Sequence, residues 1–174
     1  MPLAQDLLNE LTQEAVVTRK YLASVPFDKA DFKPHEKSES LGRLAIHVAE
    51  IIGWWKACIE QEELDFTNFE PAAIQSTEAL LAYFDGLLAE AKAALEKAKM
   101  IDLEKGTWSM RYEDIVYFTL SKKQSLRIFC MNHLVHHRAQ LGVYLRLLDI
   151  PIPAIYGPSA DDEEVLLVQP FPTS

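Results

Sequence analysis

Apolar residues recur at three- and four-residue steps over four long stretches of the chain. This spacing is typical of helices that bury one face. The stretches cover residues 3–24, 38–62, 76–100 and 122–148. Helices of this length, each with one wide apolar face, bury those faces by packing as a bundle. The pattern therefore predicts an all-α four-helix bundle, and it leaves the order and direction of the helices open.

The ends of these stretches carry the signals of helix boundaries. Pro26 follows the first stretch, and Ser38 and Ser40 are both candidate N-caps for the second. Ser121, with Gln124 three residues later, has the form of a capping box at the start of the last stretch. Three of the four predicted helices therefore have a start or stop signal of their own.

The pattern changes between the third and the fourth predicted helix. Residues 107–120 alternate apolar and polar side chains, which indicates a two-stranded or irregular excursion. Residues 64–75 have the composition of a turn-rich link, and 153–174 form a Pro-rich tail with an acidic run. Since no domain linker or internal repeat occurs, we expect a single domain over residues 1–174.

Composition mainly excludes classes of function. The formal net charge is −9, which argues against nucleic acid and anionic membranes as partners, because both select basic surfaces. The chain has 6 glycines where average usage would give about twelve, and it contains no phosphate-binding glycine loop. Four of these glycines (Gly42, Gly53, Gly86 and Gly142) fall inside predicted helices, where we expect them to let helices approach closely.

Cysteine usage and the amino terminus bear on the compartment. Cys58 and Cys130 are too few for a disulfide framework and are expected to be buried, reduced thiols. The first residues lack the basic and apolar regions of a signal peptide, and no apolar run approaches the length of a membrane span. We therefore expect a cytoplasmic protein.

The histidines are the most informative residues. His133 and His137 are four residues apart on the apolar stripe of the last predicted helix, so both imidazoles lie on one face about one turn apart. His47 lies on the apolar stripe of the second helix. If these two helices pack together, the three rings could meet and bind one metal ion. The same positions also fit core histidines that each make one hydrogen bond.

Two strings of sequence carry a family resemblance. LGRLAIHVAE around His47 and NHLVHHRAQLGVYLRLLDIPIPAIYGPS around His133 and His137 resemble the DinB/YfiT-like family of metalloenzymes. The resemblance covers most of the chain, and the second string is its most specific part. It implies a four-helix bundle in which His47, His133 and His137 hold a divalent metal. It also implies a homodimer. Ala139 stands where relatives commonly have Gly, a small change that leaves the expected site intact.

A site with three imidazole ligands has an open coordination position, as catalytic metal sites do. Imidazole ligands suit zinc, nickel or iron, and the sequence does not choose among them. Water bound there can become a nucleophile, or a thiolate or carbonyl substrate can replace it. The resemblance adds hydrolytic or thiol-dependent transfer chemistry, with a small-molecule substrate and a low-molecular-weight thiol as co-substrate.

Further residues are candidates for supporting roles. Glu50, one turn from His47, is the candidate general base or hydrogen-bond partner of a ligand; an exposed helical glutamate is the alternative. Trp54 is a candidate wall of the substrate pocket or a core residue, and Arg138 either binds a substrate anion or forms a structural ion pair. Cys130 is a weaker candidate for a fourth ligand. His136 projects off the stripe.

Two classes of function remain open at this point. The first is a metal-dependent hydrolase or thiol S-transferase. The second is non-catalytic: either a stress-response protein in which a metal only staples the bundle, or a dimeric interaction module without a metal, in which the apolar tail at residues 165–168 packs on a second chain. The presence of an open coordination position favours the first.

Overall fold

The computed structural model describes residues 3–98, 103 and 105–162. The first three helices are α1 (Leu3–Ala23), α2 (Leu41–Glu60) and α3 (Thr77–Ala98). The last helical stretch has three parts: α4 (Lys122–Ser125), the π-helical segment η2 (Leu126–Asn132) and α5 (His133–Leu147). A 3₁₀ turn, η1 (Phe27–Lys29), lies in the first connector. The mostly helical fold confirms the predicted four-helix bundle.

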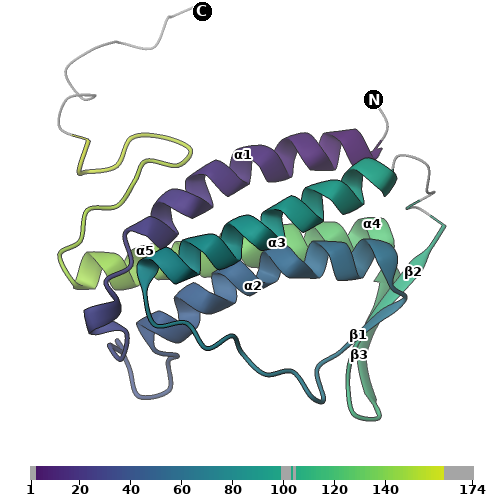
Figure 1. The fold of residues 1–174 in the computed structure, drawn as a ribbon, viewed down its shortest axis with the longest axis horizontal. Helices are drawn as coiled ribbons and strands as arrows, with labels where there is room; N and C mark the ends of the chain where they lie inside the picture. Colours follow the sequence, from purple (N-terminus) through teal and green to yellow (C-terminus); the bar gives the residue numbers. More distant parts are fainter. Residues whose placement is uncertain (1–2, 99–102, 104, 163–174) are drawn as a thin grey trace, which may run out of the picture.

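The helix directions were left open by the sequence. α1 and α5 run opposite to α2 and α3, and a long connection returns along the bundle so that α2 and α3 point the same way (Figure 1). α2 packs against both α3 and α5, and α1 packs mainly against α3. The bundle is therefore not a simple up-and-down array, and α2 lies at its centre.

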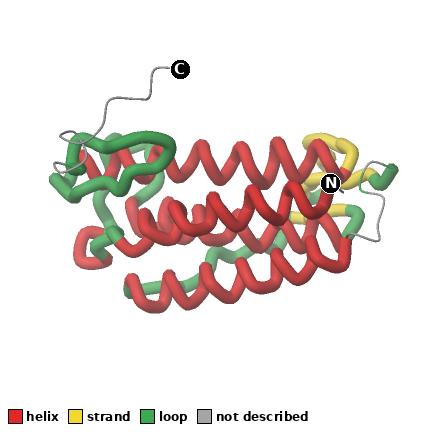
Figure 2. Tube along the Cα trace, turned by 90° about the horizontal axis from the view of Figure 1, so that it is seen from above, coloured by secondary structure: helices red, strands yellow, loops and turns green. Residues whose placement is uncertain are grey.

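A small sheet caps one end of the bundle, opposite the segment that follows α5 (Figure 2). β2 (Thr107–Tyr112) and β3 (Ile115–Ser121) form an antiparallel hairpin, which confirms the two-stranded excursion. β1 (Glu63–Asp65) pairs with β2 in parallel. The sequence analysis missed β1, because three residues are too few to show alternation and they follow directly on α2.

The structure shows which of the predicted capping residues are used at the helix ends. Ser40, not Ser38, caps α2, and its side chain accepts the Arg43 backbone N–H. The capping box of Ser121 and Gln124 is present at the start of α4. The predicted end of the third helix, at residue 100, and residues 163–174 of the tail lie outside the described residues.

One expectation about the last helix is wrong in detail. It was predicted as regular α-helix over 122–148, whereas its middle is π-helical from Leu126 to Asn132. A π segment inserts wider turns without breaking the helical path, so apolar spacing alone does not reveal it. Its position directly before His133 matters for the site described below.

Helical glycines mark close approaches at some positions. A Cβ added at Gly53 would lie 3.0 Å from the Leu87 side chain, and one at Gly142 would lie 3.0 Å from the ring of Tyr21. Gly86 is different, because it is exposed and a Cβ there would meet nothing within 4 Å. The expected role in helix approach therefore fails for Gly86.

This contrast predicts opposite outcomes for two alanine substitutions. Gly86→Ala should raise the free energy of unfolding by about 0.5–1 kcal/mol, because alanine costs less backbone entropy in a helix. Gly142→Ala should gain less or lose stability, because the buried Tyr21 ring must shift. Urea denaturation of both variants measures the difference, and equal gains would contradict the close contact at Gly142.

Candidate metal centre

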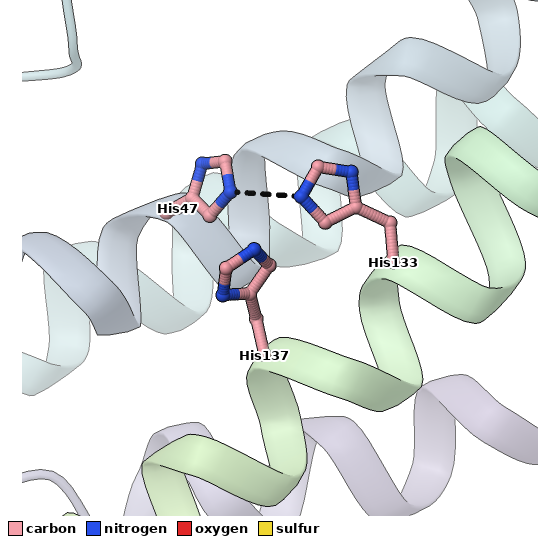
Figure 3. Close-up of side chains that lie close together, drawn as sticks. All are labelled: His47, His133 and His137. Carbon is pink, nitrogen blue, oxygen red and sulfur yellow. Dashed lines mark hydrogen bonds between the residues drawn. The ribbon is translucent and has the colours of Figure 1, made fainter.

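Three histidines from two helices converge at the middle of the bundle. His47 comes from α2, and His133 and His137 come from successive turns of α5 (Figure 3). One ring nitrogen of each lies within 4.8 Å of the others, and the Nε2 atoms of His47 and His133 are 3.4 Å apart. The predicted meeting of these three rings is confirmed. No other group of metal-ligand side chains of this kind converges within residues 3–98, 103 and 105–162.

Each ring is held from outside by a partner of its own. His47 Nδ1 lies 3.7 Å from Glu50 Oε2, and His137 Nδ1 is 2.8 Å from Gln140 Oε1. The ring of His133 bonds to the backbone carbonyl of Phe129. When Nδ1 carries the proton toward such an acceptor, Nε2 keeps a lone pair that faces the other rings. Outer acceptors of this kind are typical of histidines that bind metals.

The π-helical segment supports this arrangement. Phe129 lies within η2, four residues before His133, and supplies both the carbonyl and a ring that packs 5.6 Å from the His133 ring. π turns alter the ordinary backbone hydrogen-bond register and are frequent at functional sites. The irregular turn and the ligand geometry therefore belong to the same local structure.

Burial keeps the imidazoles of His133 and His137 neutral. Desolvation, followed by repulsion from the neighbouring rings, lowers the pKa of His133 and the pKa of His137 to about 4. A neutral imidazole is the form that binds a metal. At neutral pH, a metal would therefore not have to displace a proton from either ring.

The spacing fits a divalent metal. Two nitrogens about 2.1 Å from a tetrahedral ion are about 3.4 Å apart. The separation of the His47 and His133 Nε2 atoms, 3.4 Å, matches this value. Three imidazoles whose nitrogens face one another in a half-buried site are costly unless something shares their lone pairs. The residues present therefore fit a metal ion, and imidazole ligands are compatible with zinc, nickel or iron.

A cavity opens beside the histidines. Its volume is about 430 Å³, and His47 and His137 form part of its wall. The rest of the wall comprises Lys37, Ser38, Glu39, Arg43, Leu44, Gln140 and Tyr144. A small molecule in this cavity would lie next to two of the three proposed ligands.

Glu50 is buried, which overturns the alternative of an exposed helical glutamate. Its carboxylate accepts the Ala72 backbone N–H at 3.1 Å and pairs with Arg43 Nη2 at 2.8 Å. Burial alone would raise the pKa of Glu50, but the donors from His47, Ala72 and Arg43 outweigh it and lower the pKa below its ordinary value. This carboxylate stays ionised and holds His47, and its low pKa makes it a weak base.

Trp54 lies against the histidines but outside the cavity wall. Its ring centroid is 5.3 Å from those of His47 and His133, and it stacks on Phe129 at 4.8 Å. The side chain is buried. Trp54 therefore supports two of the rings from the apolar side, and contact with a substrate stays a prediction.

Arg138 lies in a different part of the bundle. It is buried against α1, where Nη1 pairs with Glu14 Oε2 at 2.7 Å and bonds to Thr18 Oγ1 at 3.0 Å. Its Nη2 donates to the Tyr156 hydroxyl at 2.7 Å. The structure does not bring this guanidinium to the histidines; it forms the structural ion pair that was the alternative.

The cysteines do not join the metal ligands. Both are buried and free, and burial together with the neighbouring Cys58 thiol raises the pKa of Cys130 well above its ordinary value. A protonated thiol is a poor ligand, which disfavours Cys130 as a fourth ligand. His136 is exposed, and its ring lies 4.8 Å from that of His137.

Comparison with known proteins identifies the family. The sequence matches the DinB family over residues 1–169. The chain belongs to the DinB family. An uncharacterized protein, YrdA of Bacillus subtilis (strain 168), is 26% identical over 149 residues, which is 86% of this chain and 85% of YrdA. The resemblance on which the metal ligands were first assigned is thus confirmed.

Two solved structures share the fold of this DinB-family chain. The DinB-like protein YjoA of Bacillus subtilis has a TM-score of 0.65 at 18% identity, covering 86% of this chain and 96% of that one. A DinB-like protein of Bacillus cereus ATCC 10987 has a TM-score of 0.63 at 19% identity, covering 87% and 97%. Identities this low establish the fold only. Within the described residues, no helix has the length and apolarity to cross a membrane.

Sequence reasoning missed some of the surroundings of this DinB-family site. Arg43 precedes His47 by four residues and Gln140 follows His137 by three, so both share a helix face with a ligand. This spacing could have identified both residues as neighbours of the ligands. The role of the Phe129 carbonyl could not be found in this way, because a π segment leaves no mark in the side-chain pattern.

The geometry predicts which histidines are needed for metal binding. His133→Ala should abolish stoichiometric binding of zinc or nickel, because it removes one of the three converging nitrogens. His136→Ala is the matched control and should bind one equivalent, like the wild type. Elemental analysis after dialysis against each metal measures this, and retention of metal by the His133→Ala protein would contradict the site.

The low pKa values predict a pH effect on the metal-free protein. The unfolded chain takes up protons on histidines below about pH 6.5, whereas folded His133 and His137 stay neutral to about pH 4. The unfolded state therefore binds more protons in this window, and stability falls as the pH is lowered through it. In the presence of a chelator, the free energy of unfolding of the wild type should fall more between pH 7 and pH 5 than that of a His133→Gln, His137→Gln double variant. Equal losses by urea denaturation would contradict the shifts.

Proposed function

We propose that this DinB-family protein is a metal-dependent enzyme that acts on a small molecule bound in the cavity beside the three histidines. One observation carries the proposal. Ring nitrogens of His47, His133 and His137 converge at a cavity of about 430 Å³, with His47 and His137 in its wall. A metal that only stapled the bundle would need no such opening, because structural sites are closed.

The chain's own residues account for binding and orientation. A divalent ion held by these histidines supplies a Lewis acid that lowers the pKa of a bound water or thiol. Glu50 stays ionised and orients His47, and Gln140 orients His137. The aromatic cluster of Trp54 and Phe129 covers the His133 side of the site and excludes water there.

Two reaction classes suit this arrangement. A bound water would serve a hydrolase, and a bound thiolate would serve a thiol S-transferase, with a low-molecular-weight thiol as co-substrate. Both need an open coordination position, which a site with three protein ligands provides. The expected homodimer and cytoplasmic location stay predictions.

Activity assays test the catalytic proposal. Protein loaded with zinc, nickel or ferrous iron should turn over at least one member of a panel of esters, amides and thiol acceptors. Chelation should abolish that turnover, and readdition of metal should restore it. His137→Ala should lose at least about a hundredfold in kcat/KM by loss of the metal, whereas His136→Ala should keep the wild-type value.

A structural role for the metal would give a different result. Chelation would then lower the melting temperature strongly, and no member of the panel would be turned over with any of the three metals. That outcome would overturn the catalytic proposal in favour of a metal-stapled protein.

A further inference from the structure

The cavity wall contains charged groups that the metal ligands do not explain. Two cationic side chains, Arg43 and Lys37, line it together with one acidic residue, Glu39. Hydrogen-bonding groups without charge come from Ser38, Gln140 and Tyr144. Polar side chains thus make up most of the residues of this wall, and its cations outnumber its carboxylates.

Arg43 is fixed in place at the inner end of this wall. It lies one helical turn before His47 on the same face of α2, and its Nη2 donates to Glu50 Oε2 at 2.8 Å. The same carboxylate oxygen lies 3.7 Å from His47 Nδ1. The guanidinium and the proposed metal ligand therefore share one anchor, and their relative position is set by it.

The other arm of this guanidinium lacks an acceptor. Arg43 Nη1 is buried and has no hydrogen-bond partner among the described residues, although the side chain as a whole is 26% exposed. A buried donor on a charged group that remains unsatisfied costs free energy. Because Arg43 lines the cavity and its side chain is partly exposed, a small turn of the guanidinium would present Nη1 to an acceptor on a ligand bound there.

The charge balance of the site points to an anion. Glu50 compensates Arg43, but three neutral imidazoles compensate none of the charge of a divalent ion. An anionic donor atom of a ligand at the histidines would offset the charge of the ion, and a second group that accepts hydrogen bonds would serve the unpaired arm of Arg43. A planar carboxylate suits the fork of a guanidinium better than a single point charge does.

We propose that the substrate or co-substrate is a small carboxylic acid whose carboxylate binds Arg43 while its reactive donor lies at the three histidines. This inference rests on the proposed function, since it assigns the substrate class of the same site. Lys37 is exposed at the cavity and adds a second, flexible cation to the carboxylate-binding end. Arg43 is thus a specificity-determining residue.

Thiol binding to the cobalt-loaded protein tests the inference without any assay of turnover. The two probes are 3-mercaptopropionate and 3-mercapto-1-propanol, which match in length and differ in the carboxylate. Thiolate-to-cobalt charge-transfer absorption reports binding of each. We expect the wild type to bind the acid at least about tenfold more tightly than the alcohol, as a charge-assisted hydrogen bond at a partly exposed site would give.

Three variants locate the origin of that preference. Arg43→Lys keeps a positive charge beside Glu50 but removes the second NH2 group of the guanidinium. The ratio of the affinities for the acid and the alcohol should therefore fall several-fold, while the affinity for the alcohol stays the same. Lys37→Met should lower this ratio less, and Lys33→Met, which changes an exposed cation outside the cavity wall, should leave it unchanged. The cobalt spectrum before thiol is added shows whether each variant keeps the histidine site.

The outcomes separate this inference from the proposed function. Equal affinity of the cobalt-loaded wild type for the two thiols would overturn carboxylate recognition and leave the metal centre standing. A full preference in Arg43→Lys would overturn the assignment of the carboxylate to Arg43, and a full preference in Lys37→Met as well would overturn the assignment to this wall. A wild-type protein that binds no cobalt would overturn the proposed function and this inference together.

Discussion

A buried carboxylate, Glu50, is the constraint on which the site depends. A carboxylate out of contact with water is stable only when donors surround it, and here they come from three directions. The Ala72 N–H comes from the long connection between α2 and α3, Arg43 comes from the cavity wall, and His47 is a proposed metal ligand. One group thus ties the crossover, the cavity wall and the histidine cluster to the middle of α2. Removing it would leave Arg43 with both arms unpaired and His47 without its outer acceptor.

The histidine cluster shows a second balance of opposing effects. Desolvation disfavours charged imidazoles, and three of them together would also repel one another, so the folded protein holds His133 and His137 neutral. Neutral rings with their lone pairs facing inward are already in the form a metal requires. Burying these rings lowers the free energy of unfolding of the metal-free protein, and metal binding can restore part of that stability. The same arrangement that is unfavourable in the metal-free protein is what prepares it for a divalent ion.

Much of the fold and the ligand set could be predicted from the sequence, because both leave periodic traces. Long apolar stripes predicted the four helices, and the His133–His137 spacing on a stripe predicted a shared face. The parallel direction of α2 and α3 left no trace, since a connector's composition does not say which way it runs. η2 was hidden for a related reason: a π turn changes the backbone register, not the residue types. Of the two interpretations of Arg138, the structure supports the ion pair and not the binding of a substrate anion. Its neighbour His137 faces the site, while the side chain of Arg138 faces α1.

The net charge of −9 does not conflict with an acidic substrate. Exposed charges are screened over about 10 Å at 0.1 M salt, so the outer surface contributes little to the field inside the cavity. The groups that a bound ligand meets are Arg43, Lys37 and the imidazoles, and Glu39 is the one acidic residue among the described residues of the wall. Overall charge therefore affects how fast an anion approaches, whereas the wall decides whether it stays. The net charge argues against polyanionic partners such as nucleic acid, because they would have to cover a large area of the surface, whereas a small carboxylic acid need not.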